Sequence, residues 1–140
     1  MRGVTAAANS PLRILLVEDS DLLLGVIGEM IDEIDGVELS GAAQGETAAL
    51  AQLNGTKVDL AIVDLELAEG SGLGLLRQLR SDPGRFGGSR VVVFSNHAHA
   101  AIQRQCRALG AEAFFDKSEG VEALIDFVED AAREAAAGSR

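Results

Sequence analysis

The sequence predicts a three-layer α/β fold, in which a doubly wound sheet of five parallel strands is covered by helices on both faces. Short apolar, β-rich runs alternate five times with helical patterns along the chain. These runs are almost continuously apolar, as expected for parallel strands buried on both faces. The chain has 140 residues, 47% hydrophobic and 24% charged, which is typical of one globular domain.

Five runs are predicted as strands because they are short and rich in aliphatic or aromatic residues. They lie at residues 13–17, 37–42, 58–63, 90–94 and 112–115. Each run is followed by a helical pattern, so that consecutive strands are expected to pair in parallel through helical crossovers.

The first two helices follow strands one and two. The first carries one apolar stripe at the helical period and is expected to stop at Gly36. Its stripe consists of Leu23, Ile27, Met30, Ile31 and Ile34. The second helix, at residues 44–53, is alanine-rich, and Asn54-Gly55 is its expected exit.

The third helix is predicted at residues 73–80, with Ser71 as its candidate cap and a turn at Asp82-Pro83-Gly84 behind it.

The last two helices follow strands four and five. The fourth is predicted at residues 98–109, closing on Gly110, with Cys106 on its apolar stripe and therefore in the core. The fifth is expected to reach about residue 136, and its stripe consists of Val121, Leu124, Ile125 and Val128.

One domain is expected at residues 12–136, with a loose leader at 1–11 and a tail at 137–140. The leader has no apolar stretch of the kind found in secretion signals, and the apolar runs are far shorter than the ~20 residues that span a bilayer. Too few residues follow Lys117 for an output domain, so we expect a stand-alone domain. A single cysteine cannot form an intramolecular disulfide, and this favours a cytoplasmic location.

The net charge of -10 argues against nucleic acids and anionic membranes as partners. Acidic residues outnumber basic residues 22 to 12. Nucleic-acid backbones and anionic membranes would be repelled by this charge, so neither is an expected partner.

Polar residues follow four of the five predicted strands. Glu18 and Asp19 follow the first strand, Asp64 the third, Ser95 closes the fourth, and Lys117 follows the fifth. Ligands of parallel sheets bind beyond the carboxyl ends of the strands. If the strands follow the order 2-1-3-4-5, strands 1, 3, 4 and 5 are neighbours, and we expect these side chains to converge at one edge of the sheet.

The converging carboxylates predict a metal site. Two unit charges ~4 Å apart cost about 4 kcal/mol at an effective dielectric near 20, so Glu18, Asp19 and Asp64 need compensation. Mg²⁺ together with Lys117 would balance them formally. A carboxylate beside Mg²⁺, a lysine and a hydroxyl provides the nucleophile and the cations that phosphoryl transfer requires. The pocket is therefore expected to accept phosphate on an aspartate.

Four segments carry a resemblance to a known family. They read VED at residues 17–19, VDLAIVD at 58–64 with Gly72 after it, VVFS at 92–95 and FFDK at 114–117. In order and spacing they resemble the CheY-like receiver domain of response regulators in two-component signalling. The resemblance covers residues 12 to about 136 and implies a flavodoxin-like three-layer sandwich.

The resemblance implies the role of each residue of the metal site. Asp64 would be the phosphoacceptor, and Asp19 and Asp64 would give side-chain oxygens to Mg²⁺. The backbone carbonyl of Glu66 would complete the protein ligands, while Glu18 would act through a metal-bound water.

The resemblance also implies a switch. Ser95 would be the hydroxyl that moves onto the phosphoryl oxygen, Lys117 its charge partner, and Phe114 the aromatic residue that follows Ser95 inward. We expect Ser95 and Phe114 at the ends of adjacent strands. Glu66 and His97 occupy positions that tune hydrolysis in the family.

A single-domain response regulator of this kind is regulatory rather than an enzyme with a separate substrate. It would take a phosphoryl group from a histidine kinase or a histidine phosphotransfer protein, catalysing its own phosphorylation and dephosphorylation. Its affinity for a downstream protein would then change through the surface formed by the fourth helix, fifth strand and last helix.

Two departures from the family pattern stand out. Glu18-Asp19 occurs where two aspartates are commoner. Ser118 follows Lys117 where proline is usual, and we expect Ser118 to cap the last helix.

Two alternative functions remain open. A receiver-like docking module that is never phosphorylated would typically have lost a pocket residue, and none is missing here. A haloacid-dehalogenase-type phosphatase would use Asp19, in Asp19-Ser20-Asp21, as its nucleophile. That family also needs a late acidic pair, where this chain has Asp116-Lys117.

Overall fold

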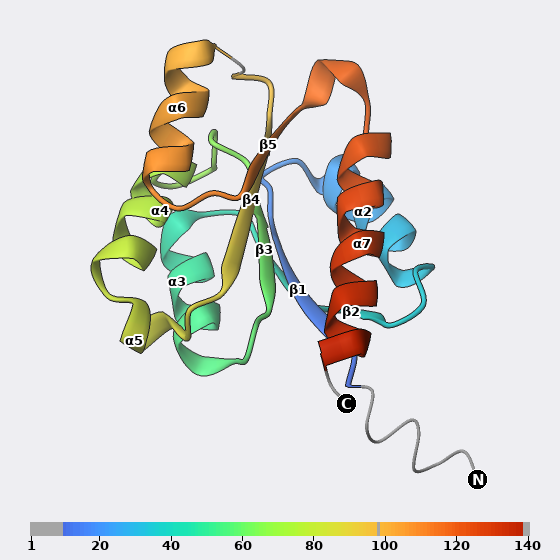
Figure 1. The fold of residues 1–140 in the computed structure, drawn as a ribbon. Coiled ribbons are helices and arrows are strands. Elements are labelled where there is room, and N and C mark those ends of the chain that lie inside the picture. Colours follow the sequence, from blue (N-terminus) through green and yellow to red (C-terminus); the bar gives the residue numbers. More distant parts are fainter. Residues whose placement is uncertain (1–9, 98, 139–140) are drawn as a thin grey trace, which may run out of the picture.

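The computed structural model describes residues 10–97 and 99–138. It confirms the predicted fold class, because five parallel strands form one sheet in the order β2-β1-β3-β4-β5 between two layers of helices (Figure 1). The strands are β1 (Leu12–Val17), β2 (Val37–Ala43), β3 (Leu60–Val63), β4 (Arg90–Ser95) and β5 (Ala113–Asp116). Residues 1–9 of the expected leader and 139–140 of the expected tail lie outside the described residues.

Helices cover both faces of the sheet. One face is covered by α2 (Asp21–Asp32) and α7 (Glu122–Gly138) (Figure 1). The other face is covered by α3 (Glu46–Gly55), α4 (Gly72–Ser81), α5 (Pro83–Phe86) and α6 (Ala100–Ala108). A 3₁₀ turn, η1 (Lys117–Glu119), joins β5 to α7. Among the described residues, no helix has both the length and the hydropathy that crossing a bilayer requires.

The core has two halves because successive side chains of a strand point to opposite faces. In β1, Leu15 and Val17 belong to the half beneath α3 to α6, whereas Ile14 and Leu16 belong to the half beneath α2 and α7. Cys106 of α6 is fully buried in the first half, as predicted. Burial of each large aliphatic side chain contributes about 1.5–3 kcal/mol, so β1 helps to anchor both helical layers.

The third helix ends before Asp82, as predicted, but the residues expected to form a turn there begin the short helix α5. Asp82 is its N-cap, with Oδ1 accepting a hydrogen bond from the backbone N–H of Arg85 (3.3 Å), and Pro83 occupies the first helical position. These two residue types favour a helix start. Gly87, with φ of 78°, ends α5 in the left-handed conformation.

The predicted capping role of Ser118 is also wrong. Ser118 lies in η1, where Asp116 Oδ1 accepts hydrogen bonds from its backbone N–H (2.9 Å) and its hydroxyl (2.8 Å). Helix α7 begins only at Glu122 and continues to Gly138, past its predicted end. The Lys117–Ser118 peptide bond is trans.

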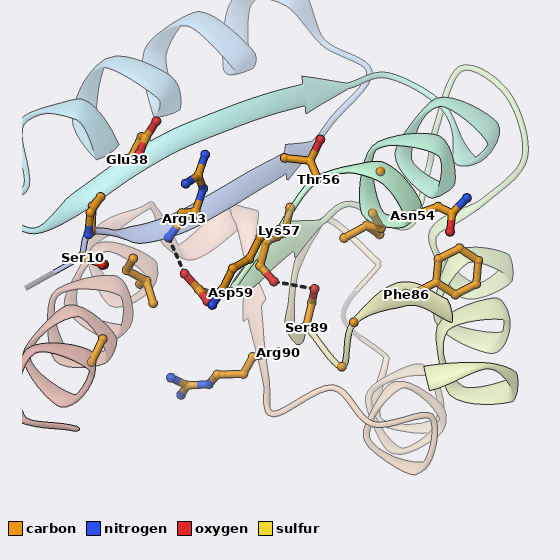
Figure 2. A pocket seen from close by; sticks show the side chains of 18 of the residues that line it. Ser10, Arg13, Glu38, Asn54, Thr56, Lys57, Asp59, Phe86, Ser89 and Arg90 are labelled. Carbon is orange, nitrogen blue, oxygen red and sulfur yellow. Dashed lines mark hydrogen bonds between the residues drawn. The ribbon is translucent and has the colours of Figure 1, made fainter. Parts of the chain in front are cut away.

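Parallel pairing separates two edges of the sheet. The carboxyl edge, where the strands end, carries the predicted site residues. The amino edge, where the strands begin, contains a cavity of about 1070 Å³ (Figure 2). In this cavity Asp59 Oδ2 accepts a hydrogen bond from the backbone N–H of Arg13 (2.8 Å), and the Ser89 hydroxyl donates to the Val58 carbonyl (2.6 Å). β3 begins only after Asp59, two residues later than predicted.

Candidate functional site

Three carboxylates lie together at the carboxyl edge. Glu18 and Asp19 directly follow β1, Asp64 directly follows β3, and these strands are neighbours. One carboxylate oxygen from each residue lies within 4.8 Å of those of the other two. Glu18 is 2% exposed and Asp64 5%, whereas Asp19 is exposed to solvent. The fold therefore concentrates like charge in an acidic group of which Asp19 is the exposed member.

The ammonium group of Lys117 connects two of these carboxylates. Its Nζ lies 2.7 Å from Glu18 Oε1 and 2.8 Å from Asp64 Oδ2, and its side chain is only 10% exposed. Because Lys117 follows β5 and Asp64 follows β3, the lysine reaches past the end of β4, with Nζ 5.8 Å from the ring centroid of Phe94. Side chains far apart in sequence thus meet in one ion-paired group.

The ion pairs leave an excess of negative charge, since one ammonium faces three carboxylates. Burial raises the pKa of Glu18, although the hydrogen bond from Lys117 opposes this effect. Burial alone would lower the pKa of Lys117, but the hydrogen bonds to Asp64 and Glu18 outweigh it and raise the pKa. The pocket therefore favours an additional cation.

Backbone amides hold the two buried carboxylates in place. The N–H of Ser20 donates to Glu18 Oε2 (3.0 Å), and the N–H of Glu66 donates to Asp64 Oδ1 (3.4 Å). Ser20 is also the N-cap of α2, with its Oγ accepting from the N–H of Leu23 (3.2 Å). The same short turn thus starts a helix and orients an acidic side chain.

Gly72 allows α4 to approach the phosphoacceptor candidate closely. A Cβ atom at position 72 would lie 2.3 Å from the carbonyl oxygen of Asp64 and 2.7 Å from the Cα of Leu65. Both atoms belong to the backbone and cannot move aside cheaply. A larger residue at position 72 would therefore displace the backbone that carries Asp64.

Ser95 and Phe114 lie on the same face of adjacent strands, but they are not both at strand ends. Ser95 ends β4, is fully buried, and accepts a hydrogen bond through Oγ from the N–H of His97 (3.3 Å). Phe114 is instead the second residue of β5 and pairs with Val93, because the strand continues to Asp116. The Phe114 ring is half-buried against the core half that contains Val93.

Two polar residues near the acidic group have other partners. His97 Nε2 lies 2.8 Å from Glu66 Oε2, and both side chains are exposed. Asp116 binds Ser118 in η1 and does not join the acidic group. The late acidic pair that the phosphatase alternative needs is therefore not formed by Asp116.

Gln44 is a residue at this edge that the sequence reasoning missed. It directly follows β2, and its Nε2 donates hydrogen bonds to the carbonyl oxygen of Asp19 (3.1 Å) and to Asp21 Oδ1 (2.7 Å). The signal was available, because the end of β2 lies beside the end of β1 in the predicted strand order.

The donor set fits Mg²⁺. The carboxylates of Glu18, Asp19 and Asp64 are all oxygen donors, which hard divalent cations prefer. The excess negative charge favours a cation over an anion. The exposed position of Asp19 leaves one side open to solvent, and this suits an ion that keeps several of its waters.

Comparison with known proteins gives a consistent family. The profile of the response regulator receiver domain matches residues 14–129. A protein-glutamate methylesterase/protein-glutamine glutaminase of Treponema denticola is 32% identical over 113 residues, covering 79% of this chain and 30% of that protein. A gliding motility regulatory protein of Myxococcus xanthus is 32% identical over 130 residues, covering 91% of this chain and 16% of that protein. The chain thus spans under a third of each relative.

Solved structures agree on the fold. The response regulator domain of Thermotoga maritima CheB superposes with a TM-score of 0.76 at 22% identity, covering 90% of this chain and 96% of that domain. The receiver domain of NarL from Mycobacterium tuberculosis superposes with a TM-score of 0.78 at 23% identity, covering 89% and 98%.

Proposed function

Because the chain belongs to the family of response regulator receiver domains, we propose that Asp64 accepts a phosphoryl group from a phosphohistidine and thereby changes the affinity of the chain for a partner protein. The observation that carries this proposal is the carboxylate of Asp64, which is buried, bound by Lys117 and placed in the acidic group. It caps no helix, because α4 begins at Gly72 and Ser71 is its N-cap. A purely structural role therefore does not explain Asp64.

The transfer step is a displacement at phosphorus. A carboxylate oxygen of Asp64 forms the new O–P bond while the N–P bond of the phosphohistidine breaks. The electron pair of that bond passes to the ring nitrogen, which leaves as a neutral imidazole after proton uptake. Lys117 would neutralise charge on the transferred group, and its distance of 2.8 Å from Asp64 Oδ2 supports this role.

Four residues would hold Mg²⁺ in this reaction. Asp19 and Asp64 would be side-chain ligands, Glu66 would contribute its backbone carbonyl, and Glu18 would act through water. When bound, the ion supplies positive charge for the phosphoryl oxygens. The excess negative charge of the pocket supports this assignment.

Phosphorylation then changes the charge at position 64 from -1 to about -2. We propose that the Ser95 hydroxyl moves toward the phosphoryl group and that the Phe114 ring fills the space it leaves. What supports this movement is that, among the described residues, the one hydrogen bond of the Ser95 hydroxyl is the one it accepts from the backbone N–H of His97 (3.3 Å). The same-face arrangement of the two side chains would carry the change to α6, β5 and α7.

The proposed partners are proteins on both sides of the reaction. The donor is a histidine kinase or a histidine phosphotransfer protein, and the downstream target binds the surface of α6, β5 and α7. Leu22 (74% exposed) and Val26 (46%) are apolar residues of α2, which begins just beyond the acidic group, and such exposure suits a protein donor. We place this regulatory, self-catalysing domain at residues 12–136 and in the cytoplasm.

Intact-mass analysis tests the proposal. Incubation with acetyl phosphate or phosphoramidate and Mg²⁺ should add one phosphoryl group to the wild type and none to Asp64→Asn. Asp59→Asn is the matched control, because Asp59 lies at the other end of β3 and should not affect labelling. Undiminished labelling of Asp64→Asn would overturn the assignment.

The two alternatives predict different masses. A docking module would not be labelled at all. A phosphatase that uses Asp19 would be labelled in Asp64→Asn but not in Asp19→Asn.

A further inference from the structure

We propose that Gln44 is a positioning residue for Asp19, and that its hydrogen bond to the Asp19 backbone sets the affinity of the acidic group for Mg²⁺. The inference rests on the proposed function, since it takes Asp19 as a metal ligand. It adds a residue outside the ligand set, supplied by a strand that contributes no ligand.

Asp19 is held differently from the other two carboxylates. Glu18 and Asp64 each bind Lys117 and a backbone amide. Within residues 10–97 and 99–138, the exposed carboxylate of Asp19 has neither a hydrogen bond nor an ion pair. The position of its oxygens beside Glu18 and Asp64 therefore depends on its backbone.

The backbone of Asp19 is held by hydrogen bonds of the residues before and after it and by one to its own carbonyl. Before Asp19, the N–H of Glu18 donates to the carbonyl of Ala43 (2.9 Å), and after it Ser20 caps α2. The carbonyl of Asp19 itself accepts the hydrogen bond from Gln44 Nε2 (3.1 Å). One side chain thus sets the orientation of the peptide group that leaves Asp19.

Gln44 is itself anchored to the loop that follows the phosphoacceptor. Its carbonyl accepts a hydrogen bond from the N–H of Ala68 (2.9 Å), and the N–H of nearby Glu46 donates to the carbonyl of Glu69 (2.9 Å). The backbone of Gln44 is therefore tied to the loop after Asp64, while its side chain is tied to Asp19. This residue links the two segments that carry the proposed ligands.

A matched pair of variants tests the role of Gln44. Gln44→Met keeps the length of the side chain but removes its donor. We expect the affinity of the unphosphorylated chain for Mg²⁺, measured by calorimetric titration, to fall about 10-fold, at the lower end of effects from groups that orient metal ligands. Gln52→Met is the control, because Gln52 Nε2 donates to the carbonyl of Ala42 (2.7 Å), away from Asp19. It should lose similar stability toward urea but bind Mg²⁺ as the wild type does.

Asp21→Ala separates the two hydrogen bonds of Gln44, since it removes one acceptor and leaves the bond to Asp19. Its Mg²⁺ affinity should change less than that of Gln44→Met. An equal loss in Asp21→Ala or in Gln52→Met would overturn the inference, and so would wild-type affinity in Gln44→Met. A wild-type chain that binds no Mg²⁺ would instead overturn the proposed metal site, and this inference with it.

Discussion

The two edges of the sheet each hold a cation among carboxylates, but their surroundings differ. At the carboxyl edge, Lys117 contacts Glu18 and Asp64, and the three side chains are 10% exposed or less. At the amino edge, Arg90 forms two hydrogen bonds to Glu112 (2.8 and 2.9 Å) and lies 3.6 Å from Glu134. These three side chains are between 32% and 68% exposed.

The difference in burial distinguishes a structural ion pair at the amino edge from a functional site at the carboxyl edge. The hydrogen bonds from Arg90 lower the pKa of Glu112, so both charges of that pair are favoured. Burial raises the pKa of Glu18, so the surroundings of this carboxylate disfavour its charged form. Buried like charges held at a cost to stability are characteristic of functional sites.

The largest expected effect concerns the switch, which should operate at the carboxyl edge alone. Phosphorylation with phosphoramidate should change amide exchange across α6, β5 and α7 and leave the amino-edge residues 53–59 unchanged. Ser95→Ala should still be phosphorylated on Asp64, but it should lose most of this response because the moving hydroxyl is gone. An equally large response in Ser95→Ala would show that the signal takes another route.

Substitution of the cationic residue should lower the free energy of unfolding more at the carboxyl edge than at the amino edge. Without metal, Lys117→Met should lower the free energy of unfolding by about 3 kcal/mol, because it leaves buried carboxylates without a partner. Arg90→Met should cost below about 1 kcal/mol at an exposed pair. Urea unfolding in EDTA measures both, and equal losses would contradict the proposed contrast.

Addition of Mg²⁺ should offset the repulsion among the carboxylates at the carboxyl edge and raise the free energy of unfolding. Mg²⁺ at about 100 times its Kd should stabilise the wild type by about 2.7 kcal/mol. Asp19→Asn should lose this gain, yet in EDTA it should be no less stable than the wild type, because it relieves repulsion. A clear loss of stability for Asp19→Asn in EDTA would show that the repulsion is unimportant.

The smallest effect is the pH dependence of the amino edge. Because the pKa of Glu112 is lowered in the folded chain, its stabilising effect is present above the unfolded pKa near 4.5 and is lost as the pH falls through the folded pKa. The difference in stability between the wild type and Glu112→Gln should therefore shrink from neutral pH to pH ~3, by no more than about 1 kcal/mol. Urea titrations along this pH range measure it, and a difference that grows toward low pH would refute the sign.

Features that follow from parallel pairing could be predicted from the sequence. Alternation of apolar runs with helical stripes requires crossovers, and these place all strand ends at one edge. Glu18, Asp64 and Lys117 meet there although 99 positions separate the first from the last.

Features that depend on one particular hydrogen bond or on the exact end of a strand could not be predicted. Ser118 and Asp116 are both good caps, and only the structure shows that Asp116 binds Ser118. The place of Phe114 depends on where β5 ends, which the apolar pattern leaves open by one residue. The strand order places Gln44 beside the end of the first strand, but nothing in its local sequence reveals that its side chain binds the carbonyl of Asp19.

The buried thiol of Cys106 provides a reporter of helix opening. It is the single cysteine of the chain and is fully buried on α6, and burial raises its pKa. An alkylating reagent can therefore reach it only when α6 separates from the sheet. The alkylation rate of the unmodified protein thus measures how often this helix opens in the native ensemble. The same measurement after phosphorylation would show whether α6, part of the proposed surface for the downstream partner, opens more or less often in the phosphorylated protein.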